Sequence, residues 1–104
     1  GENMVPYYSL AGAVGFTTGM ANLTLPLSIK LHKVAAAGRW KQAMAMRDAF
    51  EPLTMMRQEL GTPMLKAGLE MMGLAGGPVR ATGAVLDRKD RTRVRRLLKQ
   101  KKLL

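Results

Sequence analysis

Four lysines, Lys30, Lys33, Lys41 and Lys66, are the side chains best suited to covalent chemistry in this sequence. A lysine amine attacks a carbonyl carbon only where a desolvated pocket or a cationic neighbour activates it. The sequence shows neither feature, so each lysine is expected on the solvated face of a helix. His32 has no second ligand at metal-binding spacing, and it is expected to be solvated or associated with a helix end.

The composition leaves little room for metal or thiol chemistry. Among 104 residues there is no Cys and one His, so thiolate zinc sites, iron–sulfur clusters and cysteine nucleophiles have no ligands here. The nine Met residues recur at the spacing of helix faces, which predicts packing between helices rather than a soft-metal site. No metal and no cofactor are expected.

The positive charge is concentrated at the C-terminal end. The net charge is +10, and residues 80–104 hold ten basic and two acidic side chains, a net charge of +8. Apolar residues interrupt this basic segment at helical spacing and no aromatic residue is present for base stacking, so a solvated outer helix face is the preferred interpretation. The alternative is a small basic helical module that binds nucleic acid through residues 88–102.

A run without any charged residue extends from Met4 to Ile29. A membrane span is one interpretation, because about 20 apolar residues suffice to cross a bilayer. Polar residues dilute the run, and a short buried parallel strand over Ala13–Thr18, bounded by glycines, is the favoured alternative.

Four helices are predicted after this strand. One begins at Pro26 and ends before Gly38, and a second runs from about Arg39 to Leu60 with a kink or break at Pro52. Thr62 is expected to cap a third helix that ends at Gly73. Residues 79–86 are expected to be extended, and Asp87 to cap a last helix with Asp90 at its third position.

The order of these signals resembles the last third of the dihydrodipicolinate synthase and N-acetylneuraminate lyase family. The similar segments are Gly1-Glu2-Asn3, then Gly12-Ala-Val-Gly15-Phe-Thr-Thr-Gly-Met-Ala-Asn22-Leu-Thr-Leu-Pro26, then Ala-Ala-Gly38-Arg-Trp-Lys-Gln-Ala43, then Thr62-Pro63-Met-Leu-Lys66-Ala-Gly-Leu-Glu-Met-Met-Gly73-Leu and Gly77-Pro78-Val-Arg80. Together they cover essentially the whole chain.

The resemblance implies the C-terminal part of an α/β fold, the (β/α)₈ TIM barrel. Residues 1–37 would hold the end of strand seven, strand eight and helix eight, and residues 38–104 a helical extension, so that the chain itself is mostly α-helical. A closed barrel needs roughly 250 residues, so this chain is expected to be a fragment and inactive alone.

The resemblance also implies a cytoplasmic, homotetrameric lyase, an aldolase or dehydratase that needs no cofactor and does not bind a membrane. Such enzymes form a Schiff base between a lysine and pyruvate or a related 2-oxo acid. That lysine would lie upstream of residue 1, so no catalytic residue is expected here.

Four substrate-binding positions carry over by similarity. Gly1, Glu2 and Asn3 match the glycine and acidic pair that follow strand seven, with Asn3 in place of the second acid. Thr17 falls where the family commonly has Ile or Val, and its hydroxyl favours a substrate more polar than aspartate semialdehyde, such as a sugar-acid derivative. Close backbone packing is expected at Gly12, Gly15 and Gly19.

Overall fold

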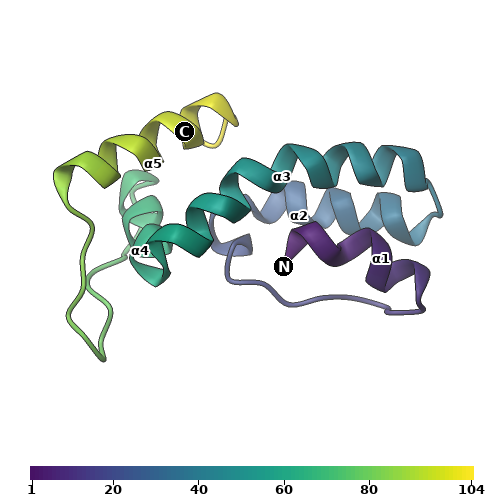
Figure 1. The fold of residues 1–104 in the computed structure, drawn as a ribbon, viewed down its shortest axis with the longest axis horizontal. Helices are drawn as coiled ribbons and strands as arrows, with labels where there is room; N and C mark the ends of the chain where they lie inside the picture. Colours follow the sequence, from purple (N-terminus) through teal and green to yellow (C-terminus); the bar gives the residue numbers. More distant parts are fainter. The chain divides into compact units, whose positions relative to one another are not determined.

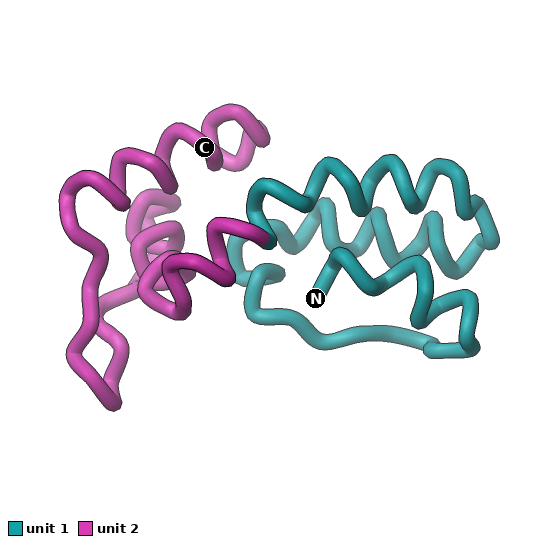
Figure 2. Tube along the Cα trace, viewed as in Figure 1, with its two compact units in different colours: residues 1–54 teal, residues 55–104 magenta.

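The computed structural model describes all 104 residues as helices and connecting segments, without a β-strand (Figure 1). A 3-10 helix, η1, spans Glu2–Met4, and it is followed by α1 Val5–Leu10, α2 Ala21–Ala36, α3 Trp40–Leu60, α4 Thr62–Met71 and α5 Arg88–Gln100. The chain divides into two compact units, residues 1–54 and residues 55–104 (Figure 2). The helical content agrees with prediction, and the two units are described in turn. The predicted boundary after residue 37 concerns the barrel and stays a prediction.

The first unit packs η1 and α1 against α2 and the first part of α3. Gly38, with a φ of 71°, lies in the turn that joins α2 to α3. Apolar side chains from α1, α2 and α3, together with Met20 just before α2, form a small core; the members are Val5, Met20, Leu23, Leu31, Val34, Ala35, Ala43, Phe50 and Leu53. The core therefore fixes the start of the chain against α2.

The predicted buried strand over residues 13–18 does not form. These residues run back past α1 toward the start of α2 without regular structure (Figure 1). The side chain of Val14 is 95% exposed, and neither Gly12 nor Gly15 has a neighbour within 4 Å of an added Cβ. A parallel strand is stabilised by hydrogen bonds to neighbouring strands. No neighbouring strand is present here, so the segment forms no sheet, and only Phe16 and Thr18 in it are half-buried. The close packing expected at Gly12 and Gly15 is absent.

Helix α2 begins five residues before the predicted start at Pro26. Thr24 has non-helical angles (φ −122°, ψ 20°), so α2 consists of a first turn, a kink and a longer helix. Pro26 lies in the first turn after the kink, where its missing amide proton costs no helical hydrogen bond. The sequence signal at Pro26 marks this second start correctly but misses the turn before it.

Helix α3 continues through Pro52, so the predicted break does not occur, whereas a kink at this residue stays a prediction. Proline removes the hydrogen bond to the carbonyl of Asp48 and crowds that group. Phe50 and Leu53, on either side of Pro52, are both buried, whereas Pro52 is exposed. Burial of these neighbours stabilises the continuous helix despite the missing hydrogen bond.

The second unit consists of the end of α3 with α4 and α5. Helices α4 and α5 pack through apolar side chains, among them Met64, Leu65, Val94, Leu97 and Leu98. The predicted cap of α5 is confirmed, because the Asp87 carboxylate accepts a hydrogen bond of 2.8 Å from the amide of Asp90.

The start of α4 differs slightly from prediction. Gly61, with a φ of 70°, is the residue before the helix, and Thr62 is its first residue, with no capping hydrogen bond from the Thr62 side chain. A left-handed φ suits glycine and disfavours threonine, which explains the shift by one residue.

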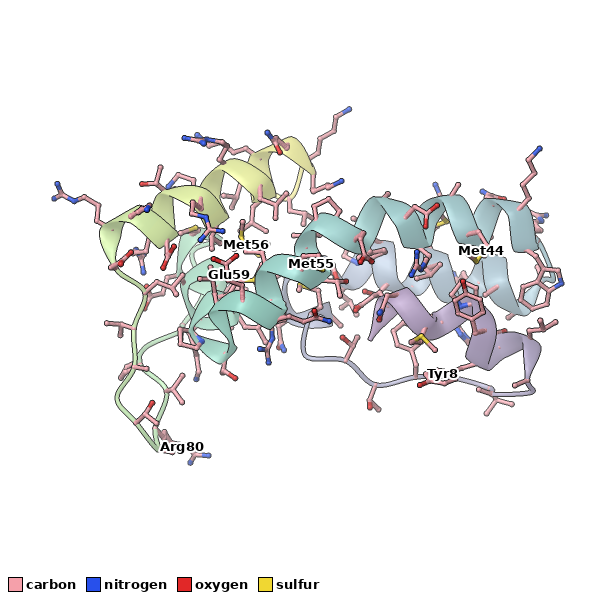
Figure 3. All side chains as sticks on the ribbon, in the orientation of Figure 1. Tyr8, Met44, Met55, Met56, Glu59 and Arg80 are labelled. Atoms are coloured by element: carbon pink, nitrogen blue, oxygen red, sulfur yellow. The ribbon has the colours of Figure 1, made fainter.

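The sequence predicts an extended connector over residues 79–86, but the structure shows a turn there. The amide of Val79 donates to the carbonyl of Ala84 at 3.0 Å, and Gly83 has a φ of 68°. The segment therefore folds back on itself in a turn whose tip holds Arg80 (Figure 3).

None of the five α-helices combines the length and the apolar character required to cross a membrane.

Candidate functional site

The carboxylate of Glu2 is the centre of a buried polar cluster in the first unit. Glu2 is 2% exposed, although it lies at the second position of the chain. Its Oε2 accepts a hydrogen bond of 3.0 Å from the hydroxyl of Thr18, and its Oε1 accepts one of 3.0 Å from the hydroxyl of Ser28. Both oxygens are therefore bound by residues distant in sequence.

The hydroxyl groups around Glu2 continue the cluster into α2. The Ser28 and Thr24 hydroxyls lie 2.9 Å apart, and Thr24 Oγ1 donates to the carbonyl of Met20 at 3.0 Å. On the other side, Thr18 Oγ1 accepts a hydrogen bond of 3.1 Å from the amide of Met20. The cluster joins the start of the chain to both sides of the kink at Thr24.

The structure brings three of the four predicted substrate residues together. Gly1, Glu2 and Asn3 are adjacent, and an added Cβ on Gly1 would lie 3.8 Å from Asn3 Oδ1 and 3.9 Å from Thr18 Oγ1. The carbonyl of Asn3 accepts a hydrogen bond of 3.0 Å from Nε of Arg47 in α3. Gly1 is exposed and Asn3 is half-buried, so both are accessible, whereas the Glu2 carboxylate is not.

Thr17 lies apart from this cluster. Its side chain is exposed and makes no hydrogen bond, whereas the neighbouring Thr18 contacts Glu2. Sequence reasoning missed Thr18, Thr24 and Ser28. Three hydroxyl residues between positions 18 and 28 in a run without charge are the signal that could have found them, because a buried hydroxyl needs a partner.

A pocket of about 240 Å³ lies beside the cluster. It is lined mainly by apolar groups, with the polar groups of Thr18, Ser28 and His32 among them; the full lining is Gly15, Phe16, Thr18, Ala21, Leu25, Ser28, Ile29 and His32. The rings of Phe16 and His32 are 6.3 Å apart. His32 is therefore half-buried beside Phe16, whereas the sequence predicts that it is solvated or associated with a helix end.

The lysines show no sign of activation. Lys30, Lys33 and Lys41 are exposed, as predicted, and Lys66 is half-buried on α4. No lysine lines the pocket beside the cluster. No group of three or more His, Asp or Glu side chains is arranged to hold a metal ion. The cluster can accept and donate hydrogen bonds, but these residues offer no nucleophile to it.

Three salt bridges lie within the second unit, two formed by Arg93 and one by Glu70. Arg93 in α5 binds Glu59 in α3 through two hydrogen bonds of 2.7 Å each, and it also binds Asp90 at 2.9 Å (Glu59 is labelled in Figure 3). The hydrogen bonds from Arg93 lower the pKa of Glu59, and those from Glu59 and Asp90 raise the pKa of Arg93. The paired geometry is the strong form of an arginine–carboxylate contact.

Glu70 forms the other ionic contact, between α4, the following loop and α5. Its Oε1 accepts from the amide of Gly77 and its Oε2 from Arg91, both at 3.0 Å. The hydrogen bond from Gly77 and then that from Arg91 lower the pKa of the Glu70 carboxyl.

Most of the basic side chains in residues 88–102 have no acidic partner. Arg91 and Arg93 form the ion pairs described above. The remaining seven basic side chains form no salt bridge, and all except the half-buried Lys101 are exposed; they are Arg88, Lys89, Arg95, Arg96, Lys99, Lys101 and Lys102. The apolar side of α5 is buried within the unit, so the predicted solvated face is present.

No family model matches the chain. Two solved structures match it along nearly its whole length. One is a dihydrodipicolinate synthetase-type protein from Pseudomonas aeruginosa, with a TM-score of 0.85 and 27% identity over 95% of this chain and 34% of that one. The other is dihydrodipicolinate synthase from Oceanobacillus iheyensis, with a TM-score of 0.84 and 26% identity over 99% of this chain and 36% of that one. The chain thus spans about a third of each protein that it matches.

Proposed function

This chain is similar in sequence and in fold to the C-terminal part of the dihydrodipicolinate synthase family, and from that premise we propose that it serves as the C-terminal third of a lyase of this type. The observation that carries the proposal is the agreement of both fold and sequence over at least 95% of the chain. Residues 13–18 would become strand eight of a (β/α)₈ barrel, and α2 its eighth helix.

The proposed reaction is the making or breaking of a carbon–carbon or carbon–oxygen bond in a 2-oxo acid such as pyruvate. A lysine elsewhere in the complete enzyme would form a Schiff base with the oxo group. The present residues would build one side of the substrate site, at which Gly1 and Asn3 are accessible and the Glu2 cluster holds them in place.

The test is borohydride trapping on the longest polypeptide that carries this sequence, with the 104-residue chain as its matched control. We expect pyruvate and borohydride to modify one lysine of the longer polypeptide, outside the present residues. The 104-residue chain should stay unmodified. Modification of Lys30, Lys33, Lys41 or Lys66, or no modification of either protein, would contradict the proposal.

Where the reaction makes or breaks a carbon–carbon bond, the 2-oxo acid has an aldehyde as its partner. This aldehyde is proposed to carry hydroxyl groups. Asn3 is a neutral amide that both donates and accepts hydrogen bonds, and Thr17 has an exposed hydroxyl. A site built to bind a substrate hydroxyl discriminates strongly against analogues that lack it. These two residues therefore favour a sugar-acid derivative over aspartate semialdehyde.

Replacing Thr17 with Val tests this substrate preference. In the complete enzyme, Thr17→Val should lower kcat/KM for a sugar-acid substrate relative to aspartate semialdehyde by about tenfold, the value of one hydrogen bond. The ratio of the two kcat/KM values is the measurement. Thr92→Val, at an exposed position of α5, is the matched control. An unchanged ratio would remove Thr17 from the substrate site.

The complete enzyme is further proposed to be a homotetramer. Large apolar side chains are exposed in the second unit, among them Met55, Leu74 and Leu104, and such residues suit a contact between subunits. Sedimentation equilibrium of the complete polypeptide should give four chains per particle.

Nucleic-acid binding is the second candidate function, and the seven basic side chains without a partner favour it. Binding to duplex DNA should then weaken steeply with salt. In a plot of the logarithm of the binding constant against the logarithm of the salt concentration, each neutralised phosphate should add about one unit of negative slope. Fluorescence anisotropy at several salt concentrations measures the slope. Loss of binding in Arg95→Ala/Arg96→Ala would support this function, and no binding at low salt would exclude it.

A further inference from the structure

Glu2 is the only charged side chain that is buried in this chain. A buried carboxylate is normally paired with a cation, because its removal from water is costly. Glu2 forms no salt bridge, and only hydroxyl groups donate hydrogen bonds to its oxygens. A side chain kept at such a cost has a role that an apolar residue would not fill.

The Glu2 carboxylate is turned into the first unit and is not exposed to solvent. Thr18 binds one oxygen and Ser28 the other, and the side chain is almost completely covered. The exposed Gly1 and the half-buried Asn3 on either side remain accessible. The position that the sequence assigned to substrate binding is therefore occupied by an internal contact.

We propose that Glu2 is a positioning residue, whose carboxylate, bound by Thr18 and Ser28, fixes the backbone of Gly1 and Asn3 at the substrate site. This inference rests on the proposed function and names the residues that shape its site. Thr18 and Ser28 share this positioning role, because each donates a hydrogen bond to one of the two carboxylate oxygens.

A second contact, from α3, fixes the backbone of the same residues. Arg47 in α3 donates from Nε to the carbonyl of Asn3 at 3.0 Å. Glu2 contacts Ser28 in the middle of α2 while Asn3 contacts α3, so residues 1–3 are held between two helices of one unit. Loss of either contact frees Gly1 and Asn3 to move.

The hydroxyl protons of the cluster predict which substitution Glu2 tolerates. Ser28 contacts Glu2 Oε1 on one side and Thr24 on the other, and Thr24 in turn contacts the carbonyl of Met20. These three contacts need three protons, but the hydroxyl groups of Ser28 and Thr24 supply only two. A glutamine amide at position 2 would donate the third proton to Ser28 and still accept from Thr18 through its oxygen. Glu2→Gln should therefore preserve the arrangement, and Glu2→Ala should destroy it.

The kinetic test compares these two variants in the complete polypeptide. Glu2→Ala should lower kcat/KM about a hundredfold, the usual effect of a misplaced substrate-binding group. Glu2→Gln should restore kcat/KM to within about fivefold of wild type, because a positioning role needs hydrogen bonds rather than charge. Both variants should still form the borohydride-trapped pyruvate adduct, since the Schiff-base lysine lies elsewhere. Equal losses in the two variants would overturn the inference, because they would show that the charge itself takes part in the reaction.

The contact between Glu2 and Ser28 can also be tested by protein stability, which does not depend on the proposed enzymatic function. In the 104-residue chain, Glu2→Ala, Ser28→Ala and the double variant form a thermodynamic cycle on the unfolding temperature. Each single variant should lower Tm by about 5 °C, and the double variant by clearly less than the sum. Thr92→Val should leave Tm almost unchanged. Strictly additive effects would show that Glu2 and Ser28 are not coupled, and would overturn the inference even if pyruvate trapping succeeds.

Discussion

A methyl group at Gly76 would lie against the carbonyl oxygen of Lys66 and 2.9 Å from Cγ of Glu70, whereas at Gly15 it would meet open space. The loop after α4 therefore returns so close to the helix that no side chain fits at this position. The first of the two glycines is required by packing, and the second is not.

Replacing Gly76 with Ala should destabilise the second unit. We expect a loss of about 1–3 kcal/mol in the free energy of unfolding, the usual cost of overpacking. Gly15→Ala is the matched control and should change it by less than about 0.5 kcal/mol. Urea unfolding of the chain measures both values. A tolerated Gly76→Ala would mean that the loop moves away from Lys66 at little cost.

At the scale of single residues, the sequence singled out Glu2 but missed Thr18, whose hydroxyl group contacts it. Thr17 and Thr18 are chemically identical neighbours, and only the path of the chain decides which of them contacts Glu2. The partners of Glu2 are 16 and 26 residues away, a distance at which no local pattern reports contact. The sequence shows that hydroxyl residues occur in the uncharged run, but it does not show which of them form hydrogen bonds with Glu2.

Helix α5 is held to the rest of its unit by carboxylates whose pKa values are lowered. Glu70 binds Gly77 and Arg91, and Glu59 binds Arg93. A carboxyl group with a lowered pKa in the folded state stabilises the fold above its unfolded-state pKa, and this contribution is lost as the pH falls through the folded-state value. The attachment of α5 is therefore expected to be sensitive to acid.

The thermal stability of the chain should fall as the pH decreases below 4.5, the ordinary pKa of these glutamates. Glu70→Gln should reduce the dependence of Tm on pH in this range, because its amide no longer titrates. High salt should weaken the contribution from Arg91 more than that from the Gly77 amide. Calorimetry over a pH series is the measurement, and an equal pH dependence in Glu70→Gln would contradict the role of Glu70.

At the scale of elements, helix ends with a side-chain signal were predictable and long-range effects were not. Asp87 caps α5 as expected, because the cap and its acceptor are three residues apart. Pro52 does not break α3, because burial of Phe50 and Leu53 outweighs a local preference. A strand over residues 13–18 depends on partners outside the segment, so its apolar character alone could not produce it.

The whole molecule exposes an unusual number of large apolar side chains near its start. Six of them fall between residues 7 and 29, in the run that lacks any charge: Tyr7, Tyr8, Leu10, Val14, Leu25 and Ile29. Under the proposed function, the remaining strands and helices of the barrel would cover part of this surface.

Val14 and Val85 provide a matched comparison for this coverage, because they are 95% and 68% exposed in the present chain. In the 104-residue chain, Val14→Lys and Val85→Lys should each change the unfolding temperature little. In the complete polypeptide, Val14→Lys should prevent folding and pyruvate trapping, because a barrel strand is buried on both faces. Val85→Lys should be tolerated. Soluble yield and trapping measure the difference, and equal behaviour of the two variants would argue against a barrel around residue 14.

The uncharged run also determines how the protein divides under trypsin, which cleaves after lysine and arginine. The first such residue is Lys30, so a complete digest leaves residues 1–30 as one peptide. Glu2, Thr18 and Ser28 all lie on it, whereas α5 is cut into pieces of a few residues. Carboxyl footprinting by mass spectrometry can therefore follow Glu2, the only acidic residue of that peptide, without interference from any other carboxyl side chain. Its protection in the folded chain and its labelling after unfolding would be read from a single ion series.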